Sequence, residues 1–163
     1  MKTISIALFA CCGLLFVPVP VLADAGHSHG GKKNGYDGHA AALGQPGDPK
    51  VPARSITVIM TDEMRFEPAT IDVRRGETIR FLVRNAGEIR HEMSLGTREE
   101  LTEHAKLMEQ HPEMEHDDPN AVTVDPGQSR PILWKFTKAG TFDFACLIPG
   151  HMQAGMTGRI VVR

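Results

Sequence analysis

Cysteine is scarce in this chain, and its placement leaves little room for a disulfide. Three cysteines occur among 163 residues, and Cys11 and Cys12 lie inside an apolar N-terminal stretch. If that stretch is removed on export, Cys146 is the single cysteine left, and an odd cysteine cannot form an internal disulfide. Cys146 must then pair with another chain, remain a thiol or bind something. A bound metal would protect it from the oxidation expected outside the cytoplasm.

A strong charge of either sign is also missing. The formal net charge is −2 at pH 7, and a balance so close to neutral does not suggest nucleic acid as a partner. The same small charge gives no indication of a docking partner.

Long apolar runs are confined to the N-terminus. Lys2 precedes an almost wholly apolar run over residues 4–21, and small residues that suit cleavage follow it. This pattern predicts a cleaved secretory signal peptide over residues 1–23 and therefore a periplasmic protein. Pro18 and Pro20, with the polar sequence after them, argue against a retained membrane helix, so we do not expect the chain to span a membrane.

Residues 24–53 have little apolar content and no periodicity, and they are rich in glycine, histidine and lysine. Such a composition predicts a disordered tail. The tail carries His27 and His29, and histidines in this arrangement can chelate Cu(II) or Zn(II). Two interpretations stay open at this point: a solvated linker, or an arm that collects metal ions.

Short strand patterns separated by glycine and proline turns fill residues 54–163. Residues 77–84 alternate polar and apolar side chains, as a half-buried strand does, and Asn85-Ala86-Gly87 ends that pattern. Further strand patterns occupy residues 55–60, 64–68, 70–73, 91–95, 121–124 and 129–136. Strands of this spacing predict an all-β domain, an antiparallel sandwich or barrel.

One segment, residues 97–119, breaks the strand pattern with a helical insertion. Thr97 and Glu100 have the spacing of a capping box, and Pro112 predicts the end of the helix. The insertion is rich in histidine and methionine, and its secondary copper-site candidates are His104, Met108, His111, Met114 and His116. At helical spacing the first three share one face with Leu101. That face either packs on the sandwich or forms a second metal site, which would suit Cu(I).

The segment from residue 140 to residue 162 brings three metal-binding residue types into one loop between two strand patterns. Cys146 ends the first strand pattern, and His151 and Met156 follow at intervals of five residues. A thiolate, an imidazole and a weak thioether are ligands of a blue-copper site, which needs one more histidine. His91 is the candidate, so the predicted copper ligands are His91, Cys146, His151 and Met156. Cys146 would bind as the thiolate, because the metal displaces its proton.

Other metal centres fit this loop less well. Structural zinc sites use several cysteines or histidines and rarely use methionine. A binuclear copper centre would need a second cysteine in the loop, and none is present. We therefore expect one type 1 copper as the cofactor. Apolar neighbours that would keep water from the metal and tune its potential are Phe142, Phe144, Leu147, Ile148 and Met152.

The ligand loop resembles those of the cupredoxins. Cys146-Leu147-Ile148-Pro149-Gly150-His151 is similar to the Cys-x-x-Pro-Gly-His run of azurins. The continuation from His151 through Met156 to Gly158 is similar to the His-x-x-Ala-Gly-Met-x-Gly ending of plastocyanins. This resemblance implies a Greek-key β-sandwich with copper bound at one end.

One position departs from the family pattern. Azurins and plastocyanins commonly have an asparagine after the first ligand histidine, where it braces the ligand loop, and Glu92 occupies that position here. Taken together, the export signal, the histidine-bearing tail, the insertion and the loop resemble the periplasmic copper-tolerance cupredoxins of the CopI type. That likeness implies a role in resisting excess copper.

These patterns lead to one functional hypothesis and two rivals. The leading hypothesis is a periplasmic, mononuclear type 1 copper-binding protein that serves copper tolerance and cycles between Cu(II) and Cu(I). The alternative is a soluble electron-transfer protein between periplasmic redox partners. A copper oxidase is the third class, but the chain is short and residues 54–163 lack the His-x-His pairs of such enzymes, so we do not expect an enzyme. The expected partners are copper ions and a redox or copper-handling protein, and the expected state is a monomer.

Overall fold

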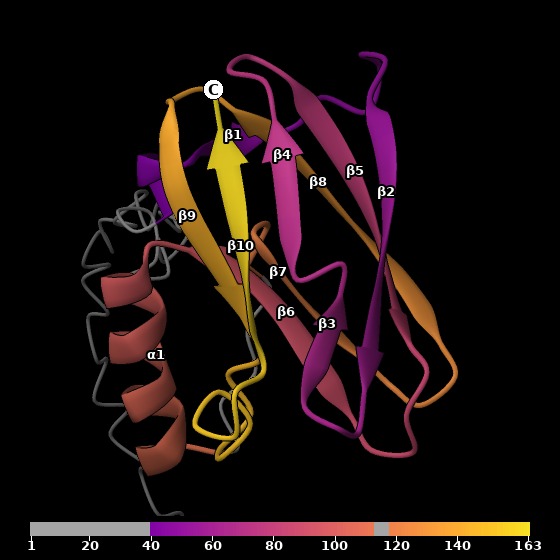
Figure 1. The fold of residues 1–163 in the computed structure, drawn as a ribbon, viewed down its shortest axis with the longest axis vertical. Helices are drawn as coiled ribbons and strands as arrows, with labels where there is room; N and C mark the ends of the chain where they lie inside the picture. The colour runs from indigo at the N-terminus through magenta and orange to yellow at the C-terminus, as the bar shows by residue number, and fades with distance from the viewer. Residues whose placement is uncertain (1–39, 113–117) are drawn as a thin grey trace, which may run out of the picture. The chain divides into compact units, whose positions relative to one another are not determined.

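The computed structural model describes residues 40–112 and 118–163, which form two β-sheets and one α-helix (Figure 1). The first sheet has the strand order β1 (Gly44–Pro46), β8 (Ser129–Phe136), β5 (Thr78–Asn85), β2 (Arg54–Thr61) and β3 (Arg65–Glu67). The second has the order β4 (Thr70–Val73), β10 (Thr157–Val162), β9 (Gly140–Ala145), β6 (His91–Gly96) and β7 (Ala121–Val124). The predicted all-β sandwich with a short helical insertion is confirmed.

The chain crosses repeatedly between the two sheets. Strands β2 and β5 pair in parallel, as do β4 and β10, while the remaining pairs are antiparallel. Parallel neighbours cannot be joined by a tight hairpin and need a crossover connection. Here the chain between β2 and β5 passes through β4 of the second sheet, and the chain between β4 and β10 passes through β5 and β8 of the first. Strands distant in sequence therefore become neighbours, and their connecting loops gather at the two ends of the sandwich.

A single apolar core lies between the sheets. Strand β5 alternates buried and exposed residues, with Phe81 and Val83 fully buried, because one face of the strand meets the opposite sheet. One aromatic pair joins the two sheets: Phe66 of the first sheet contacts Phe144 of the second edge-on, with ring centroids 5.0 Å apart. Such aromatic contacts add about 0.5–1.5 kcal/mol beyond simple burial.

Residues 40–46 correct one expectation, because they belong to the folded domain and not to an unstructured tail. Residues Ala40–Ala42 form a short 3-10 helix, and β1 pairs antiparallel with β8. Leu43 explains the difference, since its side chain is fully buried in the core. A single large apolar residue in a polar stretch has no periodicity, so sequence patterning cannot detect its burial. The expected signal peptide and the rest of the tail before residue 40 lie outside the described residues.

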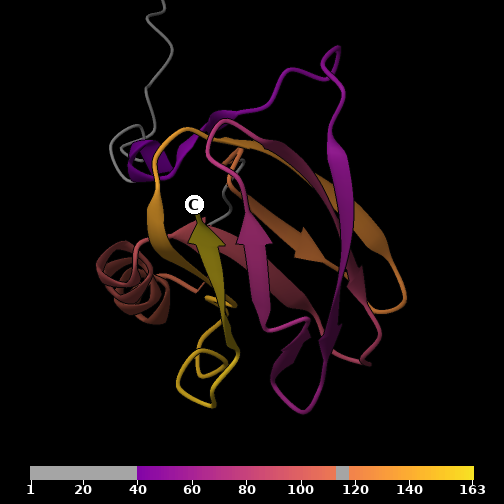
Figure 2. The same cartoon turned by 45° about the horizontal axis from the view of Figure 1, so that its top comes forward.

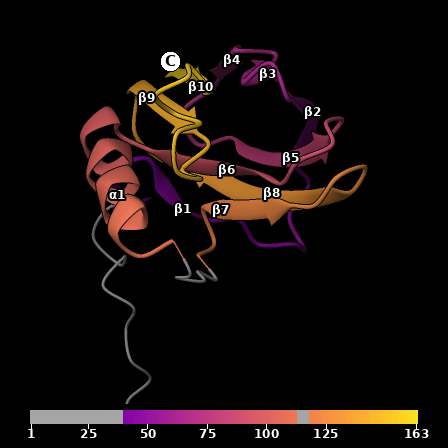
Figure 3. The same cartoon turned by 90° about the horizontal axis from the view of Figure 1, so that it is seen from below.

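Helix α1 (Arg98–Gln110) follows β6 and begins as expected. The Thr97 hydroxyl accepts from the Glu100 N–H, and the Glu100 carboxylate accepts from the Thr97 N–H at 2.7 Å, which is a complete capping box. The helix lies against β6 and β9 (Figure 3). Every residue of β6 is buried: Met93 and Leu95 lie in the core between the sheets, and Gly96 lies against Leu101 of the helix.

Three connections meet at one end of the sandwich, the lower end in Figure 1 and Figure 2. They are the β2–β3, β5–β6 and β9–β10 connections. The β9–β10 connection carries the predicted ligand loop, and the β5–β6 connection leads into His91. The fold thus brings together segments that are distant in the sequence: the Arg65 guanidinium contacts the Ala154 carbonyl, 89 residues away.

Candidate metal centre

Cys146 occupies the first position after β9, and its side chain is completely buried. The backbone N–H of Glu92 donates to its Sγ atom over 3.3 Å. Burial raises the pKa of the Cys146 thiol to about 12, with the Glu92 carboxylate adding to the rise and the N–H groups of Glu92 and Ile148 opposing it. The metal-free protein therefore keeps this sulfur as a thiol at neutral pH, and a metal ion must displace the proton.

His151 is held by the turn that follows Cys146. Gly150 adopts a positive φ of 88°, and the His151 N–H donates to the Ile148 carbonyl at 3.0 Å. The turn points the imidazole Nδ1 at the sulfur of Cys146, 3.3 Å away. Burial and the neighbouring His91 lower the pKa of His151, against a smaller opposing effect of Asp62. A neutral imidazole with a free lone pair is the form that binds metals.

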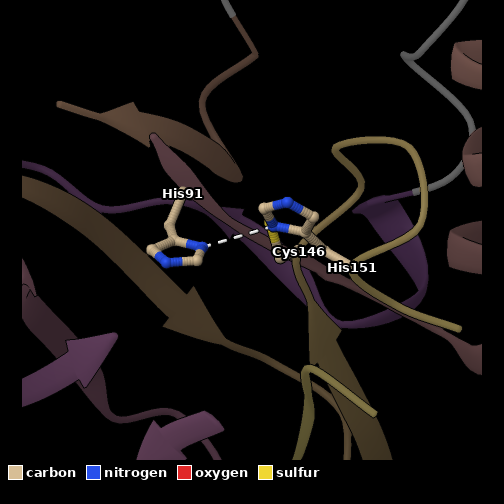
Figure 4. Close-up of side chains that lie close together, drawn as sticks. All are labelled: His91, Cys146 and His151. Carbon is tan, nitrogen blue, oxygen red and sulfur yellow. Dashed lines mark hydrogen bonds between the residues drawn. The ribbon is translucent and has the colours of Figure 1, made fainter. Parts of the chain in front are cut away.

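His91 opens β6 and is completely buried. Its Nδ1 lies 3.3 Å from Nδ1 of His151, and the two rings, tilted by 60° to one another, lie beside the Cys146 sulfur (Figure 4). Its other nitrogen, Nε2, lies 3.0 Å from Oδ1 of Asp62. Because an ionised carboxylate can only accept, this contact favours the tautomer with the hydrogen on Nε2, which leaves the Nδ1 lone pair for a metal.

Met156, the fourth residue of the predicted set, closes the loop. Its side chain is completely buried and belongs to the same apolar cluster as Cys146. Two backbone bonds pin the loop at this point: Met156 N–H donates to the His151 carbonyl, and Cys146 N–H donates to the Met156 carbonyl, at 3.0 and 3.1 Å. All four residues predicted as ligands therefore lie at the same end of the sandwich.

The donor set fits a type 1 copper. The three donor atoms of His91, Cys146 and His151 all lie within 4.8 Å of one another. Donors that each sit about 2.0–2.3 Å from one ion at a trigonal angle are about 3.7 Å apart, close to the 3.3 Å separations seen here. Two imidazoles and a thiolate, with a thioether in the same buried cluster, match the preference of copper for soft and nitrogen ligands.

Glu92 replaces the bracing asparagine of the family pattern with a different arrangement. Its backbone N–H reaches the cysteine sulfur, while its carboxylate accepts from the Ser94 hydroxyl at 2.7 Å and from the Thr123 hydroxyl at 3.3 Å. The side chain is nearly buried, at 9% exposure. The carboxylate thus joins β6 to β7 at the residue whose N–H contacts the Cys146 sulfur.

Asp62 was not found from the sequence, although it contacts His91 directly. It lies in the turn after β2, and its carboxylate also accepts from the Glu88 N–H at 2.7 Å. That bond and the His91 ring hold the pKa of Asp62 below its usual range. Its partner is 29 residues away, and an acidic residue in a turn carries no local signal of such a contact.

The candidates for a secondary copper site differ in their burial in the structure. His104 and Met108 are buried, and Met108 packs with Leu101, Ala145 and Leu147, as the packing interpretation expected. His111 is exposed at the C-cap, because the helix ends at Gln110, and its role as a copper ligand stays a prediction. Met114, His116, His27 and His29 lie outside the described residues.

Within the described ranges, α1 is the one α-helix, and it is too short and too polar to cross a membrane. The same ranges contain one group of histidine, cysteine and acidic residues close enough to hold a metal, namely His91, Cys146 and His151. A two-sheet sandwich with a His–Cys–His group at one end, of which His91 and Cys146 are buried and His151 is half-buried, is the architecture of the cupredoxin class.

Solved blue copper proteins share this fold. Auracyanin B matches with a TM-score of 0.62 at 20% identity, over 74% of this chain and 96% of its own. Auracyanin A, a blue copper protein from Chloroflexus aurantiacus, matches with a TM-score of 0.59 at 21% identity, over 69% of this chain and 100% of its own. At such identities the likeness establishes the fold alone.

Relatives with similar sequences identify the protein family. The copper-resistant cuproprotein CopI of Rubrivivax gelatinosus is 52% identical over 155 residues, which cover 94% of this chain and 93% of the relative. The protein of the same name in Pseudomonas aeruginosa is 38% identical over 77% of this chain and 84% of its own. The model of copper binding proteins of the plastocyanin/azurin family matches residues 53–163. The chain belongs to the plastocyanin/azurin family of copper binding proteins.

Proposed function

We propose that this chain is a periplasmic type 1 copper protein that serves copper tolerance, with His91, Cys146, His151 and Met156 as the ligands of one copper. The observation that carries the proposal is the group of two imidazoles and one thiol at one end of the sandwich, with donor separations of 3.3 Å. The relatives named copper-resistant cuproproteins support the physiological role. The apolar run over residues 4–21, within the predicted signal peptide, supports export.

The residues around the site define what each contributes to binding. Cys146 gives up its proton to bind, and the Glu92 N–H then donates to the resulting thiolate. Phe144 and Leu147, both at most 2% exposed, exclude water from the sulfur side. Copper held by these ligands would gain and lose one electron with little rearrangement. The half-buried His151 is the ligand nearest to solvent.

A second copper site on helix α1 forms part of the proposal. Met108 is buried in a cluster that Met152 of the ligand loop also contacts, so two thioethers lie in one cluster beside the main site. His104 is buried on the same face of the helix. Thioether and imidazole ligands suit Cu(I). A protein that stores or transfers copper would need such a site in addition to its type 1 copper.

The names of the relatives favour copper handling over the electron-carrier alternative. An electron carrier needs one copper and an accessible ligand edge, and it has no use for further copper ligands. We also propose that the protein binds copper and is not a copper oxidase. The group of His91, Cys146 and His151 suits a single copper, whereas such oxidases use a second copper cluster.

A copper titration of the mature protein tests the proposal. We expect an intense thiolate-to-copper absorption band that saturates at one copper and is absent in Cys146→Ser. Additional bound copper that disappears in Met108→Leu, with the band unchanged, supports the second site. A Cys146→Ser protein that kept the band would disprove the ligand assignment. Normal growth of a deletion strain at high copper would disprove the role in tolerance.

A further inference from the structure

We propose that Asp62 is a positioning residue that orients His91 for copper and favours Cu(II) over Cu(I). The inference rests on the proposed copper site and names a determinant of its redox balance. Metal-ligating histidines commonly donate their second ring nitrogen to an outer group, and that group influences the basicity of the ligand. Here the outer group is a charged carboxylate located on a different strand connection.

The contact is well placed to orient the ring. Asp62 Oδ1 lies 3.0 Å from His91 Nε2, and Asp62 Oδ2 lies 2.7 Å from the Glu88 N–H. The Asp62 carboxylate is thus held from two sides, by the His91 ring and by the backbone N–H of Glu88, three residues before His91. The His91 side chain is 0% exposed, so its Nε2–H relies on a protein partner, whereas the Asp62 side chain is 40% exposed.

The connection between β5 and β6 is shaped around this carboxylate. A Cβ atom added to Gly87 would lie 1.9 Å from Asp62 Oδ1, so any larger residue there would displace the carboxylate. Asn85, which is fully buried, holds the same connection in shape: its side chain accepts from the Gly87 N–H at 2.9 Å and donates to the carbonyls of Ile89 and Val124 at 2.7 and 3.0 Å.

A fixed negative charge on the outer side of a ligand histidine acts differently on the two copper states. The charge stabilises the ion with two positive charges more than the ion with one. It also makes the imidazole a better donor, which again favours the more acidic Cu(II) ion. The exposure of Asp62 screens the effect, so we expect a modest size.

The central test compares Asp62→Asn with the wild type in reduction potential. The uncharged amide should lower the ratio of Cu(II) to Cu(I) affinity about tenfold, which raises the potential by about 59 mV for one electron. Asp125→Asn is the matched control. Asp125 follows Val124, which pairs with His91 across the strands, but its carboxylate binds Arg90 and contacts none of the proposed ligands. Equal potentials in wild type and Asp62→Asn, or equal rises in both variants, would overturn the proposal.

A second readout uses the metal-free protein and so does not depend on copper binding. Nitrogen-15 shifts of the His91 ring should show the hydrogen on Nε2 in the wild type, and in Gly87→Ala this preference should weaken because Asp62 is displaced. A ring with its hydrogen on Nδ1 in the wild type would overturn the positioning role. If the wild type bound no copper yet kept the Nε2–H form, the proposed function would fail while the contact itself stood.

Discussion

Opposing forces act on the sulfur of Cys146. Burial raises the thiol pKa to about 12, which opposes ionisation, while the Glu92 N–H and a bound metal favour the thiolate. The site is therefore protected when empty and reactive only toward an ion that can displace the proton. The buried Met156 would contribute in a different way as the proposed fourth ligand, since a thioether is neutral and binds copper weakly.

Replacing Met156 by leucine separates its two roles at the residue scale. The side chains have similar volume, so we expect the buried position to tolerate the change at a cost below about 1.5 kcal/mol. The thiolate-to-copper band should remain, because Cys146 and both histidines are intact, while the reduction potential should rise through loss of a donor to Cu(II). Voltammetry and absorption measure both effects. Loss of the band in a folded variant would contradict the weak axial role.

Helix α1 couples the insertion to the ligand loop at the scale of elements. Leu101, Ala105 and Met108 pack on Ala145 and Leu147, the two neighbours of Cys146. The Arg98 guanidinium also reaches the Asp143 carboxylate of β9 at 2.9 Å. The helix therefore covers the strand that delivers the cysteine, and its first turn must be in place for this contact.

Removing the N-cap tests how much the first turn contributes. Thr97→Ala deletes the hydroxyl that accepts from the Glu100 N–H, and we expect a loss of about 1 kcal/mol in the free energy of unfolding. Urea unfolding measures this loss. Thr102→Ala is the matched control: its hydroxyl donates to the Arg98 carbonyl inside the helix, where alanine is favoured, so stability should be unchanged or slightly higher. Equal losses in both variants would contradict a capping role.

At the scale of the whole molecule, Arg54 links the two sheets and also forms an ion pair, at a place far from the metal site. Arg54 of β2 binds Glu77 through two bonds of 2.7 and 3.2 Å and donates to the Asp72 carbonyl of β4 at 2.8 Å. Glu77 also accepts from the Arg74 N–H at 2.9 Å. The bond to Arg54 chiefly holds the pKa of Glu77 below its usual value near 4.5, with burial opposing it.

This pair predicts a pH dependence of stability. A carboxyl group whose pKa is lowered on folding adds stability above the unfolded-state pKa, and that stability is lost as the pH falls through the folded-state pKa. Arg54 is 46% exposed, so screening limits the contribution to about 0.5–1 kcal/mol. Glu77→Gln should be less stable than wild type by that amount at pH 7, and the difference should vanish below the lowered pKa. Glu103→Gln, exposed on α1, provides the charge control; a Glu77→Gln deficit that persisted in acid would contradict the linkage.

Much of the site was predictable because its signals are local. Cys146, His151 and Met156 lie within one loop, and short spacings of soft ligands indicate copper without knowledge of distant contacts. The capping box at Thr97 and the strand alternation of residues 77–84 are local as well, since hydrogen bonds and burial repeat over a few residues there.

Tertiary structure alone decided which distant groups meet these residues. The register of β6 against its neighbours places the Glu92 N–H on the cysteine sulfur, and the crossing between sheets places Asp62 on His91. Burial of Leu43 likewise depends on the pairing of β1 with β8. The sequence by itself therefore determined the fold class and the donor types of the site. The outer contacts that tune the site follow from strand pairing, which is non-local and leaves no pattern along the chain.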